Sequence, residues 1–482
     1  MNQNQSDNFD DQSDNLDGLE KFLVNRRAAP SSSSGNRELD YDRFYDACDS
    51  LKPLKMNDED RKYYTDFASV RGGKIIDRIK KDVKTLQRSG NDSSYQFFTG
   101  HIGGGKSTEL NRLTGELLEE GFHVVYFMSD EYLDPHNVDI PDILLAIARQ
   151  VVENLEEIDI RLFPGYFRRL LGEIAGLLTT PLELDSVNLS LGVELAKISA
   201  EIKTSPKARN QLRTFLDSRT ASLIESLNDE ILKPAIEKLK QKGKKGLVVI
   251  VDNLERIANQ IIPNYNCTQP EYIFINRGSV LTEIKCHLVY TVPLSLLFSA
   301  QAAILLQRIG KSTSILPMIL VEEREGTVHE QGLKLLKQMV MARAFPDVSP
   351  EEHLEPDLIT QVFQDETVLN RLCQISGGHV RTLLLVLQSC LLEDDLPILH
   401  NILERVIREY RDNILVGISS NNWEVLRKVD REKQLSSDVE NYQEFLRQLW
   451  VFEYRDDQGR WFGVNPMLKE TEQFKKESSR LG

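Results

Sequence analysis

The chain has 482 residues, of which 40% are hydrophobic, and a formal net charge of -15. This length predicts about three domains with ordinary hydrophobic cores. The acidic balance argues against a general polyanion binder, because non-specific affinity for nucleic acid depends on neutralising phosphates with Lys and Arg. Five cysteines without a C-x-x-C spacing predict reduced thiols in a cytoplasmic protein, and neither a disulfide framework nor a zinc site.

Residues 1–38 predict a disordered tail, since they are rich in Asn, Gln, Asp and Ser. No basic region followed by an apolar run begins the chain, so no secretory signal is expected. Residues 39–92 are a predicted N-terminal helical segment that ends in the amphipathic run Lys74–Gln87.

The run from Gly100 to Ser107 fits the phosphate-loop pattern G-x-x-x-x-G-K-[ST] between a short apolar strand and a helix. Glycines let consecutive backbone N–H groups curl around phosphate oxygens, while Lys106 supplies a charge and Ser107 a hydroxyl to Mg²⁺. ATP and Mg²⁺ are therefore the expected cofactors, although these residues leave GTP open. The predicted nucleotide-binding residues are Gly100, Gly103, Gly104, Gly105, Lys106, Ser107 and Thr108.

Short apolar runs separated by helical segments predict an α/β fold, a P-loop NTPase core with a parallel sheet at residues 93–325. A large helical insertion at about 140–245 separates the second strand from the third. Within it, alternating apolar residues from Val187 to Leu195 predict a strand with one buried face. The core strand candidates are Tyr95–Thr99, His123–Met128, Leu247–Val251, His287–Thr291 and Met318–Val321.

The uncharged run Leu288–Gln307 is long enough to span a bilayer. Pro293 and the polar residues spread through it instead favour a buried strand, a turn and a buried helix. No membrane association is expected.

Residues 326–412 predict a helical lid, and residues 413–482 a C-terminal winged helix. The second prediction depends on two helices, around Trp423–Glu432 and Asp438–Trp450. They are followed by strand candidates Val451–Tyr454 and Trp461–Val464 about a turn.

A phosphate loop needs a carboxylate on a neighbouring strand to hold Mg²⁺. Asp252, at the end of a buried strand, is the predicted metal residue together with Ser107. Asn253 cannot accept a proton from the attacking water, so Glu255 is the candidate base. Glu255 has the alternative of pairing with its neighbour Arg256.

Three further residues are predicted near the γ-phosphate. Thr291 ends the next strand, where its hydroxyl would contact the phosphate or the water, or would simply end the strand. Arg308 closes the following helix, where it would reach a neighbouring subunit's nucleotide. Arg381, after two glycines in the lid, would reach back to the phosphates. His101, inside the phosphate loop, is expected to point outward.

These motifs resemble the AAA+ and STAND branches of the P-loop ATPases, which include bacterial origin-recognition-like and KAP-type proteins, over roughly residues 41–468. The run from Asp252 to Arg256 is similar to the D-D-L-D-R run of STAND and KAP proteins and departs from the D-E pair of AAA+ proteins. The resemblance implies ATP-dependent switching or assembly. It also implies Thr291 as a sensor, Arg308 as an arginine finger and Arg381 as the lid sensor.

Three functions follow. The first is an ATP-hydrolysing molecular switch whose output, signalling or defence, passes to protein partners or through a homo-oligomer. The second is a DNA-binding or DNA-loading ATPase. The acidic candidate reading helix Asp438–Trp450 disfavours it, while basic residues on the earlier helix and at the hairpin turn keep it open. The third is a non-hydrolysing nucleotide-binding scaffold, for which Asn253 is the reason.

Overall fold

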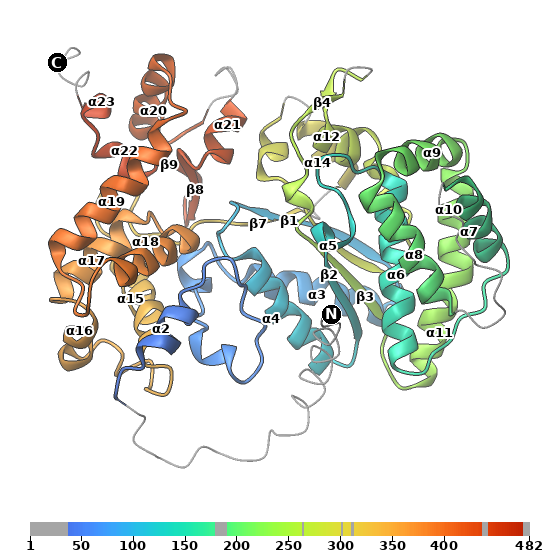
Figure 1. The fold of residues 1–482 in the computed structure, drawn as a ribbon, viewed down its shortest axis with the longest axis horizontal. Helices are drawn as coiled ribbons and strands as arrows, with labels where there is room; N and C mark the ends of the chain where they lie inside the picture. Colours follow the sequence, from blue (N-terminus) through green and yellow to red (C-terminus); the bar gives the residue numbers. More distant parts are fainter. Residues whose placement is uncertain are drawn as a thin grey trace, which may run out of the picture.

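The computed structural model describes residues 37–178, 190–262, 265–299, 302–309, 313–435 and 442–475. Almost all of the predicted tail 1–38 lies outside these ranges. Figure 1 shows two lobes, one built on the central sheet and its helical insertion, the other made of the lid and the C-terminal elements. Within the described ranges, no helix combines the length and the apolar character that a membrane span needs.

The core is a parallel five-stranded sheet in the order β2-β3-β6-β1-β7. The register pairs Met128 with Asp252 and Phe98 with Thr291, so Asp252, Thr291 and Gly100 lie at the same carboxyl edge. The predicted α/β fold with a parallel sheet is confirmed. The strands are β1 (Ser94–Gly100), β2 (His123–Met128), β3 (Leu247–Asp252), β6 (His287–Thr291) and β7 (Thr313–Leu316).

The prediction for the fifth strand was wrong in position. β7 lies a few residues before the predicted run Met318–Val321. Met318 and Leu320 are buried instead against the C-terminal hairpin, and the Met318 amide donates to the carbonyl of Glu453 at 2.9 Å. The apolar character of this run therefore comes from contact with the C-terminal hairpin and not from membership of the sheet.

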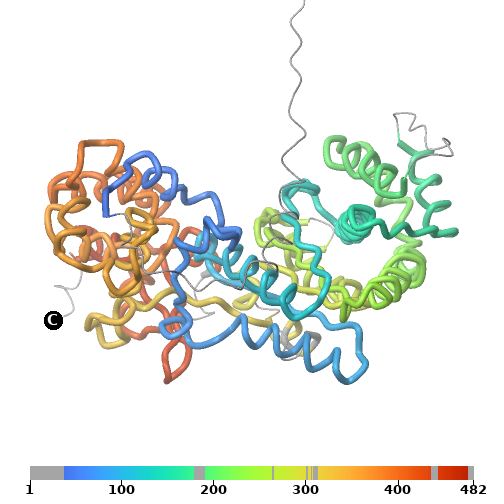
Figure 2. Tube along the Cα trace, turned by 90° about the horizontal axis from the view of Figure 1, so that it is seen from below, coloured from blue at the N-terminus to red at the C-terminus, as the bar shows by residue number. Residues whose placement is uncertain are grey.

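Alternate residues of the strands face two different layers. Val248 and Ile250 pack on α3 (Ile75–Arg88) and α4 (Lys106–Glu119). Val249 and Val251 pack in the larger core shared with α6 (Ile140–Glu157) and the insertion. Figure 2 shows α3 and α4 in blue between the green insertion and the orange lid.

The insertion is helical, and its predicted strand was wrong. Residues 191–195 begin helix α8, and the rest of that candidate, 187–189, lies outside the described residues. Buried Leu191, Leu195, Ile198 and Ile202 recur at intervals of four, three and four, which is helical spacing. The insertion helices that follow α6 are α7 (Tyr166–Leu177), α8 (Leu191–Thr204), α9 (Pro206–Asp217), α10 (Thr220–Ser226) and α11 (Lys233–Gln241).

Shorter elements follow β2, β3 and β6. They are α5 (Ser129–Tyr132), β4 (Ile261–Ile262), β5 (Cys267–Thr268), α12 (Gln269–Glu271), α13 (Gly278–Thr282) and α14 (Ala302–Ile309). The apolar run Leu288–Gln307 thus contains most of β6, the 3-10 helix Leu294–Phe298 directly after Pro293, and most of α14.

The lid is a helical cluster that also buries part of the N-terminal segment. Phe44 and Cys48, from and just after α2 (Tyr41–Ala47), are fully buried among lid side chains. The predicted N-terminal segment 39–92 is therefore divided between the two lobes, because α2 packs in the lid and α3 packs on the sheet. The lid helices are α15 (Glu330–Ala344), α16 (Pro356–Val362), α17 (Glu366–Ile375), α18 (Val380–Glu393) and α19 (His400–Leu415).

The C-terminal elements form their own core around Trp423, Phe445 and Trp450. Two helices followed by an antiparallel hairpin are present in the predicted order. The second helix ends earlier than predicted, at Arg447, and the start of the predicted range Asp438–Trp450 lies outside the described residues. The elements are α20 (Ser420–Glu432), α21 (Tyr442–Arg447), β8 (Val451–Asp456), β9 (Gly459–Val464), α22 (Pro466–Lys469) and α23 (Glu472–Lys475).

Candidate functional site

The phosphate loop connects β1 to α4 at the carboxyl edge of the sheet. Gly105 immediately precedes α4 with a φ of 95°, a left-handed conformation that favours glycine. The guanidinium of Arg71 is fully buried beside this loop and donates through Nη2 to the Gly104 carbonyl at 2.8 Å. The loop is thus curled at the start of a helix, with its N-terminal N–H groups available to an anion.

Lys106 is held by groups of the protein itself. Its Nζ lies 2.8 Å from Oε1 of Glu255 and donates to the carbonyls of Gly100 and His101 at 3.2 and 3.1 Å. The two charged side chains are only 3% and 5% exposed. Burial alone would raise the pKa of Glu255, but the charge and hydrogen bond of Lys106, with a hydrogen bond from Thr291, lower it. Glu255 is therefore an ionised carboxylate.

Asp252 lies next to Ser107 and is fully buried. It accepts hydrogen bonds from Tyr126 Oη at 2.8 Å, from the Asn253 amide at 2.7 Å and from the Ser107 hydroxyl. Burial, and then the nearby charge of Glu255, raise the pKa of Asp252. A hydroxyl and a carboxylate are the hard oxygen ligands that Mg²⁺ prefers, and a divalent cation here would relieve the repulsion between the two carboxylates.

The Tyr126 hydroxyl predicts an effect on metal affinity. Because it donates to Asp252, Tyr126→Phe should remove the bond that orients this carboxylate and raise the Mg²⁺ concentration needed for nucleotide binding roughly tenfold. A Mg²⁺ titration at fixed ATP measures this. Tyr290→Phe is the control, since Tyr290 is a buried tyrosine of the same sheet that donates to the Leu281 carbonyl and not to Asp252. Equal Mg²⁺ requirements in the two variants would contradict the assignment.

Asn253 and Arg256 both face Asp130, which the sequence analysis did not single out. Asn253 has a φ of 63° and donates through Nδ2 to Asp130 Oδ1 at 2.9 Å. Arg256 Nη1 lies 2.9 Å from Asp130 Oδ2. The alternative pairing of Glu255 with Arg256 is therefore not formed. Glu255, and not residue 253, faces the phosphate loop.

Thr291 is fully buried at the end of β6. Its Oγ1 accepts a hydrogen bond from the Leu254 amide at 3.0 Å. Its hydroxyl also forms a hydrogen bond with Glu255, which contributes to the lowered pKa of that carboxylate. The structure thus brings Thr291 to the candidate base. Arg308 lies in α14, but its side chain is outside the described part of the structure.

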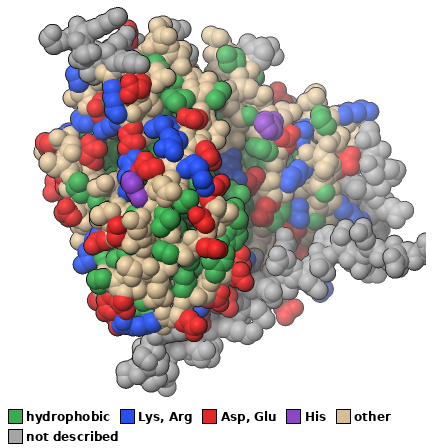
Figure 3. Space-filling model, turned by 60° about the vertical axis from the view of Figure 1, so that its left-hand side comes forward, with side chains coloured by type: hydrophobic (Ala, Val, Ile, Leu, Met, Phe, Trp, Pro, Cys, Tyr) green, Lys and Arg blue, Asp and Glu red, His purple; other side chains and the backbone are tan. Residues whose placement is uncertain are grey.

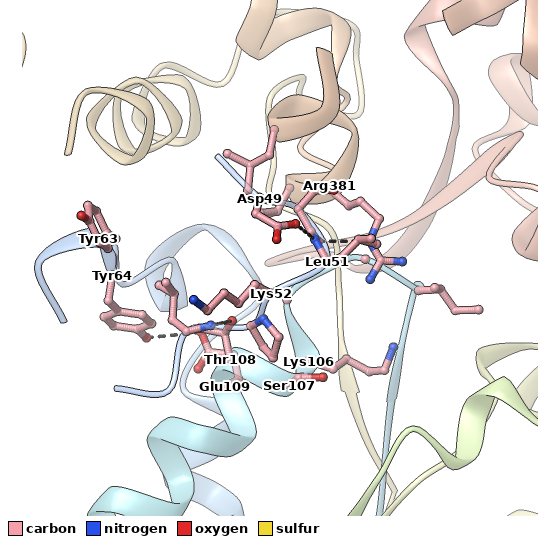
Figure 4. Close-up of a pocket in the computed structure, with 18 of the residues that line it drawn as sticks. Asp49, Leu51, Lys52, Tyr63, Tyr64, Lys106, Ser107, Thr108, Glu109 and Arg381 are labelled. Carbon is pink, nitrogen blue, oxygen red and sulfur yellow. Dashed lines mark hydrogen bonds between the residues drawn. The ribbon is translucent and has the colours of Figure 1, made fainter. Parts of the chain in front are cut away.

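The lid touches the phosphate loop directly. The Arg381 amide donates to the Gly103 carbonyl at 3.1 Å, and His379 Nε2 donates to the Ile102 carbonyl at 2.7 Å. Burial, and then the charge of Arg256, lower the pKa of Arg381. Figure 4 shows Arg381 on the opposite side of the pocket from Lys106 and Ser107. The predicted lid arginine therefore borders the same pocket as the phosphate loop.

Gly103 tests this contact between loop and lid. A Cβ at this position would lie 2.7 Å from Arg381 Cβ and 2.9 Å from His379 Nε2, and its φ is 81°. Gly103→Ala should lower the free energy of unfolding by about 2 kcal/mol, measured by urea denaturation. Gly115→Ala is the control, because Gly115 lies within α4 with open space around it and alanine there should be stabilising. An unaffected Gly103→Ala protein would show that the lid is not held this closely.

His101 was predicted to point outward and does not. Its side chain is 2% exposed, and its Nε2 accepts from the Glu453 amide at 2.8 Å. Burial, followed by the charges of His379 and Lys106, lowers its pKa to about 3, so the ring is neutral. The C-terminal hairpin covers this part of the loop, which no local pattern in the sequence indicates.

The pocket has a cavity volume of about 240 Å³. Its walls include side chains that the sequence analysis missed: Leu54, Tyr63, Tyr64, Arg71, Met339, Arg343 and Leu384. The strap 49–54 is anchored to α4, since the Leu54 amide donates to Thr108 Oγ1 at 3.3 Å. For Arg71 alone among these residues the sequence holds a signal, the adjacent pair Gly72–Gly73. Both glycines have a positive φ, and such a pair is typical of a tight turn.

Neither a protein-family model nor a curated protein matches the chain. Among solved structures, Cdc6p from Pyrobaculum aerophilum is similar at 13% identity and a TM-score of 0.33, covering 88% of this chain and 98% of that one. The ORC1 protein of Aeropyrum pernix in complex with DNA is similar at 11% identity and a TM-score of 0.33, covering 85% of this chain and 93% of that one. Drosophila ORC bound to DNA is similar at 10% identity and a TM-score of 0.36, covering 94% of this chain and 96% of that one. Likenesses this loose do not bear on function, which depends on the geometry above.

Proposed function

We propose that this protein binds ATP with Mg²⁺ between the phosphate loop and the lid, and works as a nucleotide-gated switch that hydrolyses ATP slowly. The observation that carries the proposal is the convergence of Lys106 and Arg381, from two lobes of the molecule, on one pocket. In this proposal residues 93–325 are the nucleotide core, 326–412 the lid and 413–482 the output domain.

The charge of the pocket supports an anionic ligand. The chain as a whole carries a net charge of -15, yet the basic side chains at this pocket outnumber the acidic ones by six to four. A polyphosphate fits that local excess, and the apolar side chains of Leu54, Met339 and Leu384 offer a surface for a base. The basic residues are Lys52, Arg71, Lys106, Arg256, Arg343 and Arg381, and the acidic ones are Asp49, Glu109, Asp130 and Glu255.

The gating follows from the contact between loop and lid. A triphosphate that reaches Arg381 would join core and lid more tightly than a diphosphate, so the two nucleotides would favour different lid positions. Protein partners, or further copies of the chain, would read that difference. Arg308 would then act on the nucleotide of a neighbouring copy.

Hydrolysis requires that Glu255 be freed from Lys106. Mg²⁺, held by Ser107 and Asp252, would neutralise the phosphate charge. Once Lys106 turns to the phosphates, the Glu255 carboxylate becomes able to accept a proton from water, and Thr291 would orient it. Because Lys106 must first leave a buried ion pair, we expect turnover to be slow.

Calorimetric titration with ATP, ADP and GTP in the presence of Mg²⁺ tests the binding, and phosphate release tests the hydrolysis. We expect ATP to bind and to be turned over. Binding without phosphate release would leave the scaffold function, and the absence of binding would refute the proposal. The particle mass with ATP, ADP and no nucleotide would show whether Arg308 acts between subunits.

A DNA-binding function is the alternative, through a winged helix made by α20, α21 and the hairpin. Some of its basic side chains are engaged within the protein, since Lys433 pairs with Asp430 and Arg460 lies over the ring of Phe298. Figure 3 shows acidic and basic side chains interspersed on one face of the lid and C-terminal lobe. Fluorescence anisotropy with duplex DNA at two salt concentrations decides, because contacts to phosphate weaken as salt rises.

A further inference from the structure

The C-terminal hairpin contacts the phosphate loop without any intervening element. The amide of Glu453 on β8 donates to Nε2 of His101, and the ring of Phe452 lies 5.7 Å from the His101 ring in an edge-on arrangement. Both rings are buried, at 2% and 1% exposure. The second residue of the nucleotide-binding motif is thus fixed to the far C-terminal part of the chain.

The same phenylalanine also contacts the lid. Phe452 stacks on His379 at 5.9 Å, and a Cβ on Gly377 would lie 2.6 Å from the Phe452 ring. Tyr454, two residues along β8, donates to the Gly377 carbonyl at 2.7 Å. The phosphate loop, the lid and the hairpin therefore meet around the Phe452 ring. Because the packing is close, a shift of any one of them changes the contacts of the other two.

The hydrogen bonds determine the tautomer of the His379 and His101 imidazoles. His379 donates from Nε2 to the Ile102 carbonyl, so its Nδ1 accepts from Thr382. His101 accepts at Nε2, so its proton is on Nδ1. Both rings are neutral, because burial is the largest of the causes that lower their pKa values, to about 4 for His379 and about 3 for His101. The contact therefore depends on geometry and not on charge.

We expect nucleotide binding to disturb the contact between the His101 ring and β8. Lys106 Nζ donates to the backbone carbonyl of His101 itself, and a bound phosphate would draw the ammonium away. The loop has space to respond, because Gly100, His101 and Ile102 border a second cavity of about 320 Å³, part of whose wall comes from Leu446–Gln448. The free and bound loops would then present the His101 ring differently to β8.

We propose that His101 is a positioning residue that transmits nucleotide occupancy of the phosphate loop to the hairpin β8–β9, which is the output element of the switch. The inference rests on the proposed nucleotide binding. It assigns to His101 and Phe452 a role in coupling, whereas Lys106 and Ser107 have the role of binding.

The tryptophans of the chain provide the measurement. All three, at positions 423, 450 and 461, belong to the C-terminal core or hairpin, and Trp461 stacks on Tyr454 at 4.6 Å. Tryptophan fluorescence therefore reports on this region alone. Adding ATP or ADP with Mg²⁺ to the wild-type protein should change it, with free N-acetyltryptophanamide as the control for absorption by the nucleotide.

Two variants of His101 separate coupling from binding. His101→Leu removes the acceptor for the Glu453 amide, so it should bind nucleotide in the calorimeter with the fluorescence change lost. His101→Gln retains an acceptor and should restore the change. A wild-type fluorescence change that persists in His101→Leu would overturn the coupling, as would bound nucleotide that leaves wild-type fluorescence unchanged. No binding at all in the calorimeter would instead refute the proposed function.

Hydrogen exchange gives a second measurement that needs no variant. The Glu453 amide donates to His101 Nε2, and this hydrogen bond should slow its exchange. Peptides that cover β8 should exchange faster when nucleotide binds, if the loop moves away from the hairpin. Unchanged exchange in β8 under saturating nucleotide would also overturn the inference.

Discussion

Replacing Lys106 by Ala is expected to weaken ATP binding on the order of 100-fold. Lys106 is the charged group at the centre of the phosphate loop, and hydrogen bonds to a charged group contribute about 1.5–3 kcal/mol each. The deletion also leaves Glu255 buried without the ammonium at 2.8 Å that compensates its charge. The dissociation constant for ATP, measured by calorimetry, is the readout.

Lys81→Ala is the matched control, because Lys81 is an exposed lysine on α3, away from the pocket. Thermal unfolding of both variants distinguishes loss of the site from loss of the fold. A folded Lys106→Ala protein with unchanged affinity would remove the phosphate loop from nucleotide binding, and with it the proposed function.

The sequence predicted those parts of the candidate site that depend on local pattern. Lys106 and Ser107 follow a strand and open a helix, while Asp252 and Thr291 end buried strands. The carboxyl ends of parallel strands meet at one edge of a sheet, so these residues could be placed together without coordinates. The helical nature of the insertion and the lid followed from the same kind of periodicity.

Contacts between distant segments could not be predicted in this way. The Lys106–Glu255 ion pair, the Arg71–Gly104 hydrogen bond and the burial of His101 depend on how segments far apart in the sequence pack together. The strand predicted from Val187 to Leu195 was wrong, because a few apolar residues at alternate positions also occur in a helix that is apolar on most of its surface. The longer run from Leu191 to Ile202 decides between the two periods, because its buried residues recur at helical spacing.

Replacing Glu255 by Gln is expected to tighten ATP binding roughly tenfold while it slows hydrolysis. The charge of Lys106 is paired with that of Glu255, and a polyphosphate must break that pair and approach a buried carboxylate of its own sign. Glutamine leaves Lys106 without its counter-ion before binding and removes the repulsion afterwards. Both effects favour the complex, and a tenfold change corresponds to about 1.4 kcal/mol.

Turnover in the same variant tests the second role of Glu255. An amide cannot accept the proton of the attacking water, so phosphate release should fall on the order of 100-fold. Glu116→Gln is the control, since Glu116 pairs with Lys80 on the surface of α4. Unchanged turnover would remove Glu255 as the base, and weaker binding would show that its pairing with Lys106 is not a barrier to nucleotide. If affinity rises as turnover falls, one carboxylate accounts for both the restrained state of the free protein and the chemistry of the bound one.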